Sequence, residues 1–249
     1  MAKAPPVASY KLIKRTEQAQ DTFELTFERP AGDFLPGQFI SIIIPGAGPG
    51  GRDLRRAYSI ASPPQFQGRF ELSIKLVQGG PGTTYLNSLK AGDEIRGQMP
   101  MGDFIMKHPE DAPALFIGTG TGVAPHRAMV LSKNHPWQAP LGFLQGVRAE
   151  IDVIYPELFA ADRPLPLRNA EHLKICLSRP ADRDAWLRKP EGYVGRVTDY
   201  LRNEMQDWDW AKSHYYLCGS GPMIIEVEGW LMNDKGVSKT QIHKEAYFK

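Results

Sequence analysis

The first hundred residues of the chain alternate apolar and polar side chains with a period of two. Apolar residues occupy every second position in residues 23–27 and again in residues 70–76. Clusters of glycine and proline separate such runs at residues 30–37, 45–51 and 79–82. Short alternating runs bounded by turn residues are typical of antiparallel strands. The pattern therefore predicts an antiparallel β-barrel or sandwich in this half of the chain.

The pattern changes after Pro113, where short apolar runs alternate with helical stripes. We expect buried strands at residues 114–117, 141–144, 173–177 and 215–217, and helices at residues 124–131 and 222–235. Strands that alternate with helices indicate a doubly wound parallel sheet. Residues 107–113 are rich in proline and resemble a linker, so we place the domain boundary after residue 108. The predicted fold is a β-barrel domain (1–108) followed by an α/β domain (109–249).

A glycine-rich turn follows the first strand of the α/β half. The apolar segment 114–117 leads into Gly118, Thr119, Gly120 and Thr121, and a third glycine and an Ala-Pro pair precede the expected helix. Glycines let the backbone approach a pyrophosphate, and the N-terminus of a helix supplies N–H groups and a positive dipole. An ordinary glycine-rich turn would explain one or two of these residues. The alternate spacing of three glycines favours a dinucleotide site.

Arginines follow three successive strands or turns of the same half. A site for NAD usually has an acidic residue at the end of the second strand, where this chain has Arg148. Ser178 and Arg179 follow the third strand, and Arg196 comes later in a Gly-Arg-Val string. Each arginine alone fits a solvated surface. Together they favour NADP over NAD, because guanidinium groups bind a 2′-phosphate by paired hydrogen bonds.

The barrel half contains a second group of residues suited to a cofactor. Arg56 offers a charge for a phosphate, Tyr58 an aromatic ring for stacking, and Ser59 a hydroxyl for a ring nitrogen. Gly82 and Thr83 precede an expected short helix, whose N–H groups and hydroxyls suit a second phosphate charge. An edge strand with ordinary surface residues would explain the first string if it stood alone.

Two further features lie near the C-terminus. Cys218 ends a buried strand and is followed by Gly219 in a Cys-Gly-Ser-Gly-Pro string. A buried cysteine is often only packing, but the carboxyl end of a strand faces the crevice where α/β proteins bind ligands. Tyr247 and Phe248 close the chain, where two aromatic residues suit either the anchoring of a last strand or the covering of a flavin ring.

Composition and charge exclude several classes of protein. Hydrophobic residues make up 42% and charged residues 23% of the 249 residues, which is the composition of a globular chain. No apolar run approaches the roughly 20 residues of a membrane span, and no secretory signal is visible, so we expect a cytoplasmic protein. A net charge of +2 does not favour nucleic-acid binding. The cysteines, Cys176 and Cys218, and the histidines form no metal-ligand pattern, so we expect no metal.

Taken together, the motifs resemble those of the ferredoxin–NADP reductase superfamily, in particular its bacterial ferredoxin/flavodoxin–NADP reductases. The motifs that carry the resemblance occur in the family's order: Gly37-Gln38-Phe39, Arg56-x-Tyr58-Ser59, Gly80-x-x-Thr83, Gly102-Asp103-Phe104, the glycine-rich string of residues 118–125, Cys218-Gly-x-Gly-Pro-Met223 and a C-terminal glutamate followed by Tyr247 and Phe248. The resemblance covers about residues 10–248. It implies a Greek-key barrel that binds FAD and an α/β domain that binds NADP.

The resemblance also implies roles for individual residues. Arg56 would contact the FAD pyrophosphate, Tyr58 would stack on the isoalloxazine ring, and Ser59 would bond near flavin N5. The remaining contacts to FAD would come from Ala57, from the backbone of Ile74 and Lys75, from Gly82 and Thr83 at the phosphates, and from Tyr247 or Phe248 over the ring. The remaining contacts to NADP would come from Gly118, Thr119, Gly120, Thr121 and Gly219 along the dinucleotide and from Arg148, Ser178, Arg179 and Arg196 at the 2′-phosphate. Cys218 would adjoin the nicotinamide, with Glu245 as a nearby proton-path residue, and with Ser59 these form the expected catalytic set.

The function that the resemblance implies is a flavoenzyme with ferredoxin–NADP⁺ reductase activity. It would pass a hydride from NADPH to N5 of FAD and then release electrons singly to ferredoxin or flavodoxin, acting as a monomer. One alternative is an NADH-dependent reductase component for an oxygenase or a cytochrome, although the cysteines of a fused ferredoxin domain are absent. The other is a non-catalytic FAD-binding electron-transfer subunit, which the presence of Cys218, Glu245 and the arginines disfavours.

Overall fold

The computed structural model of the chain describes residues 5–29, 33–108, 111–133 and 137–247. The contacts divide it into two compact units. One comprises Met1–Met106 with Arg127–Ser132, and the other Lys107–His126 with Lys133–Lys249. We retain a domain boundary after residue 108 as a proposal. Within the described ranges, none of the helices has both the length and the apolar character needed to cross a membrane.

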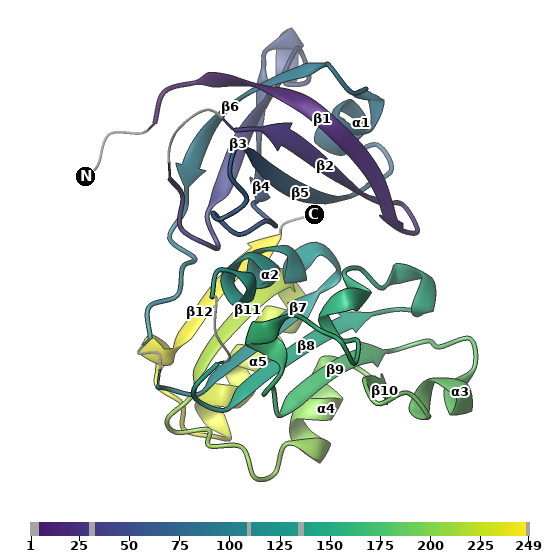
Figure 1. The fold of residues 1–249 in the computed structure, drawn as a ribbon, viewed down its shortest axis with the longest axis vertical. Helices are drawn as coiled ribbons and strands as arrows, with labels where there is room; N and C mark the ends of the chain where they lie inside the picture. Colours follow the sequence, from purple (N-terminus) through teal and green to yellow (C-terminus); the bar gives the residue numbers. More distant parts are fainter. Residues whose placement is uncertain (1–4, 30–32, 109–110, 134–136, 248–249) are drawn as a thin grey trace. The chain divides into compact units, whose positions relative to one another are not determined.

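The first unit is built on a six-stranded antiparallel sheet with the order β4-β3-β6-β1-β2-β5, drawn in purple to blue-teal in Figure 1. Its strands are β1 Ala8–Ala19, β2 Thr22–Glu28, β3 Phe39–Ile44, β4 Leu54–Ser59, β5 Arg69–Lys75 and β6 Glu94–Met101, and it carries the helix α1 Pro81–Ser88 and the short 3₁₀ turn η1 Pro49–Gly51. A bridge between Ile60 and Leu72 joins the two edges of the sheet and closes it into a barrel. The predicted antiparallel barrel is confirmed.

The apolar side chains of the period-two pattern fill the interior of the barrel. Phe23 pairs with Ile74 across β2 and β5, and Leu25 pairs with Leu72 in the same register. All four side chains are buried, because alternate residues of a strand point to the same face of the sheet. Their polar neighbours point to the opposite face, where several contacts described below are made.

The second unit is a parallel sheet with the order β10-β9-β8-β7-β11-β12 and helices packed against it. Its elements are β7 Ala114–Thr119, α2 Val123–Leu131, β8 Leu141–Val147, β9 His172–Leu177, α3 Arg183–Leu187, β10 Gly192–Val194, α4 Val197–Glu204, β11 His214–Ser220, α5 Gly221–Asn233 and β12 Ile242–Tyr247, with the 3₁₀ turns η2 Gly120–Gly122, η3 Glu150–Asp152, η4 Pro156–Leu158, η5 Leu165–Leu167 and η6 Lys239–Gln241. The chain runs outward from β7 through β8, β9 and β10 and then returns to the other side of β7. The reversal between β7 and β11 is a topological switch point, the place where open α/β sheets bind ligands. The predicted doubly wound sheet is confirmed.

The last helix, α5, has the predicted buried face but not the predicted end. The predicted apolar stripe of α5 is buried at Met223, Ile224, Val227 and Leu231. The helix itself ends at Asn233, earlier than the predicted end at residue 235. Gly236 has a positive φ of 68° and lets Val237 N donate a hydrogen bond to Leu231 O, so the glycine reverses the chain just after the helix.

Candidate cofactor-binding sites

In the barrel, the structure brings Arg56, Tyr58 and Gly82 together. A Cβ atom built on Gly82 would lie 2.6 Å from the Tyr58 hydroxyl and 3.1 Å from Arg56 Cγ. The first turn of α1 therefore packs against two side chains of β4 in a space that no larger residue fits. Burial raises the pKa of Tyr58 to about 12, and the nearby Arg56 charge opposes this only in part, so the hydroxyl is protonated at neutral pH.

The start of α1 has the properties of an anion site. The helix begins after Gly80 without a side-chain cap, has Pro81 in its first turn and has no acidic residue there. The first backbone N–H groups of a helix have no partner within the helix, so they can donate to a phosphate. The Oγ1 atom of Thr83 accepts a hydrogen bond from Val77 N at 3.1 Å and lies 3.2 Å from Gly80 O, and its contact with a phosphate stays a prediction. The hydroxyl thus shapes the loop that presents the helix.

Ser59 lies at the buried end of β4, opposite Phe39 of β3. Two glycines lock this end of the barrel. A Cβ on Gly37, which has a φ of 98°, would overlap Phe104 O, and one on Gly102 would lie 2.7 Å from the Phe39 ring. The Gly-Gln-Phe and Gly-Asp-Phe strings are therefore packed against each other, and both hold the strand that pairs with Ser59.

Ile74 and Lys75 end β5, an edge strand of the sheet. The Ile74 side chain is buried in the barrel core. Beyond the bridge at Leu72, this end of β5 has a strand neighbour on the β2 side only, within the part of the chain that is described. An edge strand presents backbone groups to a ligand, which suits the expected backbone contacts. Ala57 lies exposed on β4.

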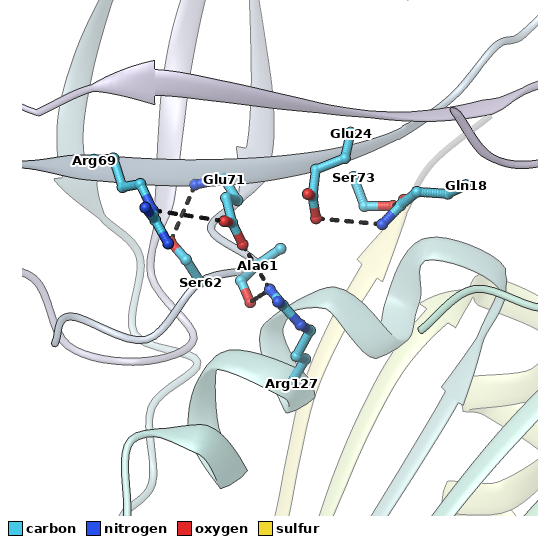
Figure 2. Close-up of polar contacts among 8 residues, drawn as sticks. All are labelled: Gln18, Glu24, Ala61, Ser62, Arg69, Glu71, Ser73 and Arg127. Atoms are coloured by element: carbon cyan, nitrogen blue, oxygen red, sulfur yellow. Dashed lines mark hydrogen bonds and ion pairs between the residues drawn. The ribbon is translucent and has the colours of Figure 1, made fainter. Parts of the chain in front are cut away.

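Arg127 and Glu71 form a contact that the sequence analysis did not predict. Figure 2 shows their side chains meeting beside Ala61 and Ser62, which follow Ser59 by two and three residues. The one available signal was Arg127 itself, a charged residue within the largely apolar stretch Val123–Leu131. Nothing in the sequence pairs it with Glu71, which lies 56 positions earlier.

In the second unit, the glycine-rich turn connects β7 to α2 through η2. Gly120 has a φ of 54°, in the left-handed region that favours glycine. A Cβ on Gly118 would lie 2.6 Å from Val123 Cγ1, and one on Gly122 would overlap the carbonyl oxygen of Cys218. The turn is thus packed tightly against the end of β11, and Thr121 lies within it.

The Cys-Gly-Ser-Gly-Pro string packs in turn against the glycine-rich turn after β7. Gly219 has a φ of 125°, and a Cβ there would overlap Thr119 Oγ1. The Thr119 hydroxyl accepts a hydrogen bond from Ser220 N at 2.9 Å. The two glycine-rich turns therefore interlock at the carboxyl ends of β7 and β11, at the switch point of the sheet. The structure brings together all the residues that the sequence predicted for this part of the site.

Cys218 lies in register between Gly118 of β7 and Glu245 of β12. Burial raises the pKa of its thiol well above the ordinary value, and the Glu245 carboxylate raises it further, while a hydrogen bond with Tyr247 acts in the opposite direction. Cys218 is therefore a neutral thiol at physiological pH. Glu245 and Tyr247 are both half-buried on the last strand. Phe248 lies outside the described residues.

The predicted arginine group lies at the carboxyl edge of β8, β9 and β10. Val147 is opposite Leu177, and Leu177 is opposite Val194, so these three strands end side by side. Arg179 N donates to Arg148 O at 2.7 Å. Arg148, Ser178, Arg179 and Arg196 are all exposed. Within the described ranges, none of the three guanidinium groups forms an ion pair, although the backbone N–H of Arg196 donates to the Asp199 carboxylate at 2.8 Å.

Comparisons with known proteins find a cofactor-binding domain in each half of the chain. Residues 9–106 match the family model of the oxidoreductase FAD-binding domain, and residues 116–228 match that of the oxidoreductase NAD-binding domain. Ferredoxin–NADP reductase B of Sorangium cellulosum (strain So ce56) is 33% identical over 229 residues, which cover 90% of this chain and 91% of that protein. The chain belongs to the ferredoxin–NADP reductase family. It is an FAD- and NAD(P)-binding oxidoreductase, which confirms the predicted cofactors at that level.

Other relatives in this family are longer. The phenol hydroxylase P5 protein of Acinetobacter pittii (strain PHEA-2) is 30% identical over 232 residues, which cover 90% of this chain but only 60% of that protein. Among solved structures, a ferredoxin–NADP⁺ reductase from Neisseria gonorrhoeae with bound FAD and NADP has a TM-score of 0.81 at 20% identity, with 97% of this chain and 99% of that chain covered. At that identity the likeness shows the fold.

The residues present fit both cofactors. In the barrel, Gly82 lets the start of α1 approach the side chains of Arg56 and Tyr58 closely. In the α/β unit, Gly122 allows the start of α2 to lie against the backbone of Cys218. Each site therefore combines a helix N-terminus with a glycine at a close approach, as phosphate-binding turns require.

Proposed function

We propose that this chain is a ferredoxin– or flavodoxin–NADP⁺ reductase that transfers electrons between NADP(H) and a one-electron carrier. The observation that carries the proposal is the group Arg148, Arg179 and Arg196 at one strand edge, whose guanidinium groups form no ion pair in the described chain. Such a group suits the doubly charged 2′-phosphate that distinguishes NADP from NAD. The likeness to a ferredoxin–NADP reductase over 91% of that relative's length supports the carrier class.

In the barrel, Arg56 and the first N–H groups of α1 would bind the FAD pyrophosphate. Tyr58 would stack on the isoalloxazine ring, Ser59 would donate a hydrogen bond near N5, and the edge of β5 at Ile74 and Lys75 would supply backbone contacts. Ala57, Gly82 and Thr83 would complete the cofactor's surroundings. When bound, FAD supplies the exchange between a two-electron hydride donor and a one-electron carrier, and the protein supplies binding and orientation.

In the α/β unit, the start of α2 and the turn from Gly118 to Thr121 would bind the dinucleotide pyrophosphate, with Gly219 beside it. Arg148, Ser178, Arg179 and Arg196 would bind the 2′-phosphate end. Cys218 would contact the nicotinamide as a neutral, apolar thiol, because its burial disfavours the thiolate. Glu245, beside it in the sheet, would hold or pass a proton.

A second candidate is a reductase component that uses NADH and serves an oxygenase. The likeness to the phenol hydroxylase P5 protein favours it, with 30% identity over 90% of this chain. The two candidates differ in nucleotide and in carrier. The oxygenase candidate requires no 2′-phosphate site, so it leaves the three exposed arginines without a role.

Steady-state assays of the purified holoprotein separate these candidates. NADPH and NADH would each be supplied with a ferredoxin, a flavodoxin or an artificial acceptor. We expect kcat/KM for NADPH to exceed that for NADH by at least about tenfold, since the charged contacts to the 2′-phosphate stabilise only the NADPH complex. We also expect reduction of ferredoxin or flavodoxin. A preference for NADH, with no reduction of either carrier, would support the oxygenase candidate. Failure with every acceptor would support a non-catalytic subunit.

A further inference from the structure

Arg127 makes two short contacts in a nearly buried position (Figure 2). Its Nη1 atom donates to Glu71 Oε2 at 2.8 Å and to Ala61 O at 3.0 Å. The exposed fraction of the side chain is 11% for Arg127 and 10% for Glu71. Residues 127–132 belong to the same compact unit as the barrel. One guanidinium group thus binds both a strand carboxylate and a loop carbonyl.

Glu71 holds the same loop through its backbone. Ala61 N donates to Glu71 O at 2.8 Å, and Glu71 N donates to Ser62 Oγ at 3.0 Å. Arg69 also approaches the carboxylate, with Nε 3.9 Å from Oε1, but its side chain is half exposed. Residues 61 and 62 are therefore fixed to β5 by two hydrogen bonds with the backbone of Glu71, and the carbonyl of Ala61 also accepts a hydrogen bond from Arg127.

This loop directly continues the strand that ends in Ser59. The next residue, Ile60, forms the bridge to Leu72 that closes the barrel. The direction in which β4 ends, and with it the position of the Ser59 hydroxyl, depends on how residues 60–62 are held. Removing one partner of a buried ion pair leaves the other charge without compensation, so the contact with Arg127 constrains this loop more than an exposed pair would.

We propose that Arg127 is a positioning residue for the flavin. Through Ala61 O and Glu71 it holds the loop after β4 in the arrangement that aims Ser59 at the cofactor. The proposal rests on the proposed role of Ser59 at the flavin ring. It requires no contact between Arg127 and the flavin, because the effect passes along residues 59–61.

The test compares variants of the FAD-loaded protein. Arg127→Met removes the two contacts, and Arg69→Met is the matched control, since it removes a cation beside the same carboxylate without touching Ala61. For each protein we would record the visible spectrum of bound flavin, the dissociation constant of FAD and the rate of flavin reduction at saturating NADPH. We expect Arg127→Met to shift the flavin spectrum and to slow reduction about tenfold or more with little change in KM, because small misplacements near the reacting centre are costly. Arg127→Lys should restore part of both effects, and Arg69→Met should behave as the wild type.

The proposal is overturned if Arg127→Met lowers the melting temperature while its flavin spectrum and reduction rate match those of Arg69→Met. If Arg127→Met cannot be loaded with FAD, Glu71→Gln decides, since it keeps the size of the side chain. A shifted spectrum and slower reduction in Glu71→Gln support the proposal, and wild-type values overturn it. The wild type reports separately on the proposed function: wild-type flavin that neither NADPH nor NADH reduces would refute that function, whatever the variants show.

Discussion

Cys218 lies directly beside Glu245 in the parallel pair β11 and β12, near the carboxyl ends of both strands. A thiol and a carboxylate are thus held side by side, and burial together with the carboxylate charge raises the pKa of the thiol. The consequence is a cysteine that carries no charge at physiological pH. This suits a surface for a flat nicotinamide ring better than a nucleophile, which requires a lowered pKa.

The protonated state of Cys218 predicts slow alkylation. We expect iodoacetamide to modify the native protein at pH 8 at least about a hundredfold more slowly than the urea-unfolded protein, because only an accessible thiolate reacts. Cys176, the other cysteine, is also fully buried and has a raised pKa, so the prediction covers both thiols. Intact-mass spectrometry over time measures the rates. Rapid labelling of the native protein would show that at least one of the two thiols is accessible and ionised.

Substitution of Gly122 tests the packing of the dinucleotide turn. In Gly122→Ala, the new methyl group would overlap the Cys218 carbonyl, so the turn must shift. We expect a loss of about 1–3 kcal/mol of unfolding free energy and weaker binding of NADP⁺, measured by urea unfolding and calorimetry. Gly229→Ala is the control, because a Cβ at this position in α5 has no atom within 4 Å; it should stabilise the protein by about 0.5–1 kcal/mol. Equal NADP⁺ affinity in the two variants would contradict the assignment of the turn.

Removal of the arginine group should weaken the binding of NADPH but not that of NADH. In Arg148→Ala/Arg179→Ala, we expect KM for NADPH to rise roughly a hundredfold, since hydrogen bonds to charged groups contribute about 1.5–3 kcal/mol each. KM for NADH should stay within about twofold, because NADH has no 2′-phosphate. Arg202→Ala is the control, since Arg202 already forms an ion pair with Glu226 at 3.2 Å. Equal losses with both nucleotides would place the 2′-phosphate elsewhere.

His126 predicts a sensitivity to acid. The residue is fully buried in α2 between Phe116 and Phe143, and burial lowers its pKa to about 3. Between that value and about 6.5 the unfolded chain binds a proton that the folded chain does not, so stability falls as the pH falls, by about 1.4 kcal/mol per pH unit. Between pH 6.5 and pH 5, we expect the unfolding free energy of His126→Phe to fall by about 2 kcal/mol less than that of the wild type. Urea unfolding at both pH values measures this, and identical pH dependence would show that His126 is protonated in the folded state.

The sequence predicted the elements and site residues whose structure depends on neighbouring residues in the chain. The alternation in residues 23–27 predicted a strand because its register is set by burial, and the spacing of Gly118, Gly120 and Gly122 predicted a turn that only glycine can form. The arginine group was also predictable, because each member follows a parallel strand, and parallel strands end at one edge. What could not be predicted depends on long-range contacts. The pairing of Arg127 with Glu71 joins residues that are 56 positions apart in the sequence, and no local signal specifies it.

Some local details could not be predicted for the same reason. The hydroxyl of Thr83 suits a phosphate by type and position, but the sequence does not show that in the folded chain it accepts a hydrogen bond from Val77 N. The end of α5 was placed too late because Gly236 acts on the chain after the helix rather than within its last turn. The complete fold determines which hydrogen-bond partner a polar group contacts, whereas the sequence shows only which donors and acceptors are present.

An anaerobic titration of the FAD-loaded protein with NADPH and, separately, with NADH, followed by the visible spectrum, tests the preference for NADPH without any carrier protein. We expect NADPH to bleach the flavin band at near-stoichiometric amounts and NADH to bleach it only at much higher concentration. Bleaching by NADH as readily as by NADPH would contradict the assignment of Arg148, Arg179 and Arg196 to the 2′-phosphate.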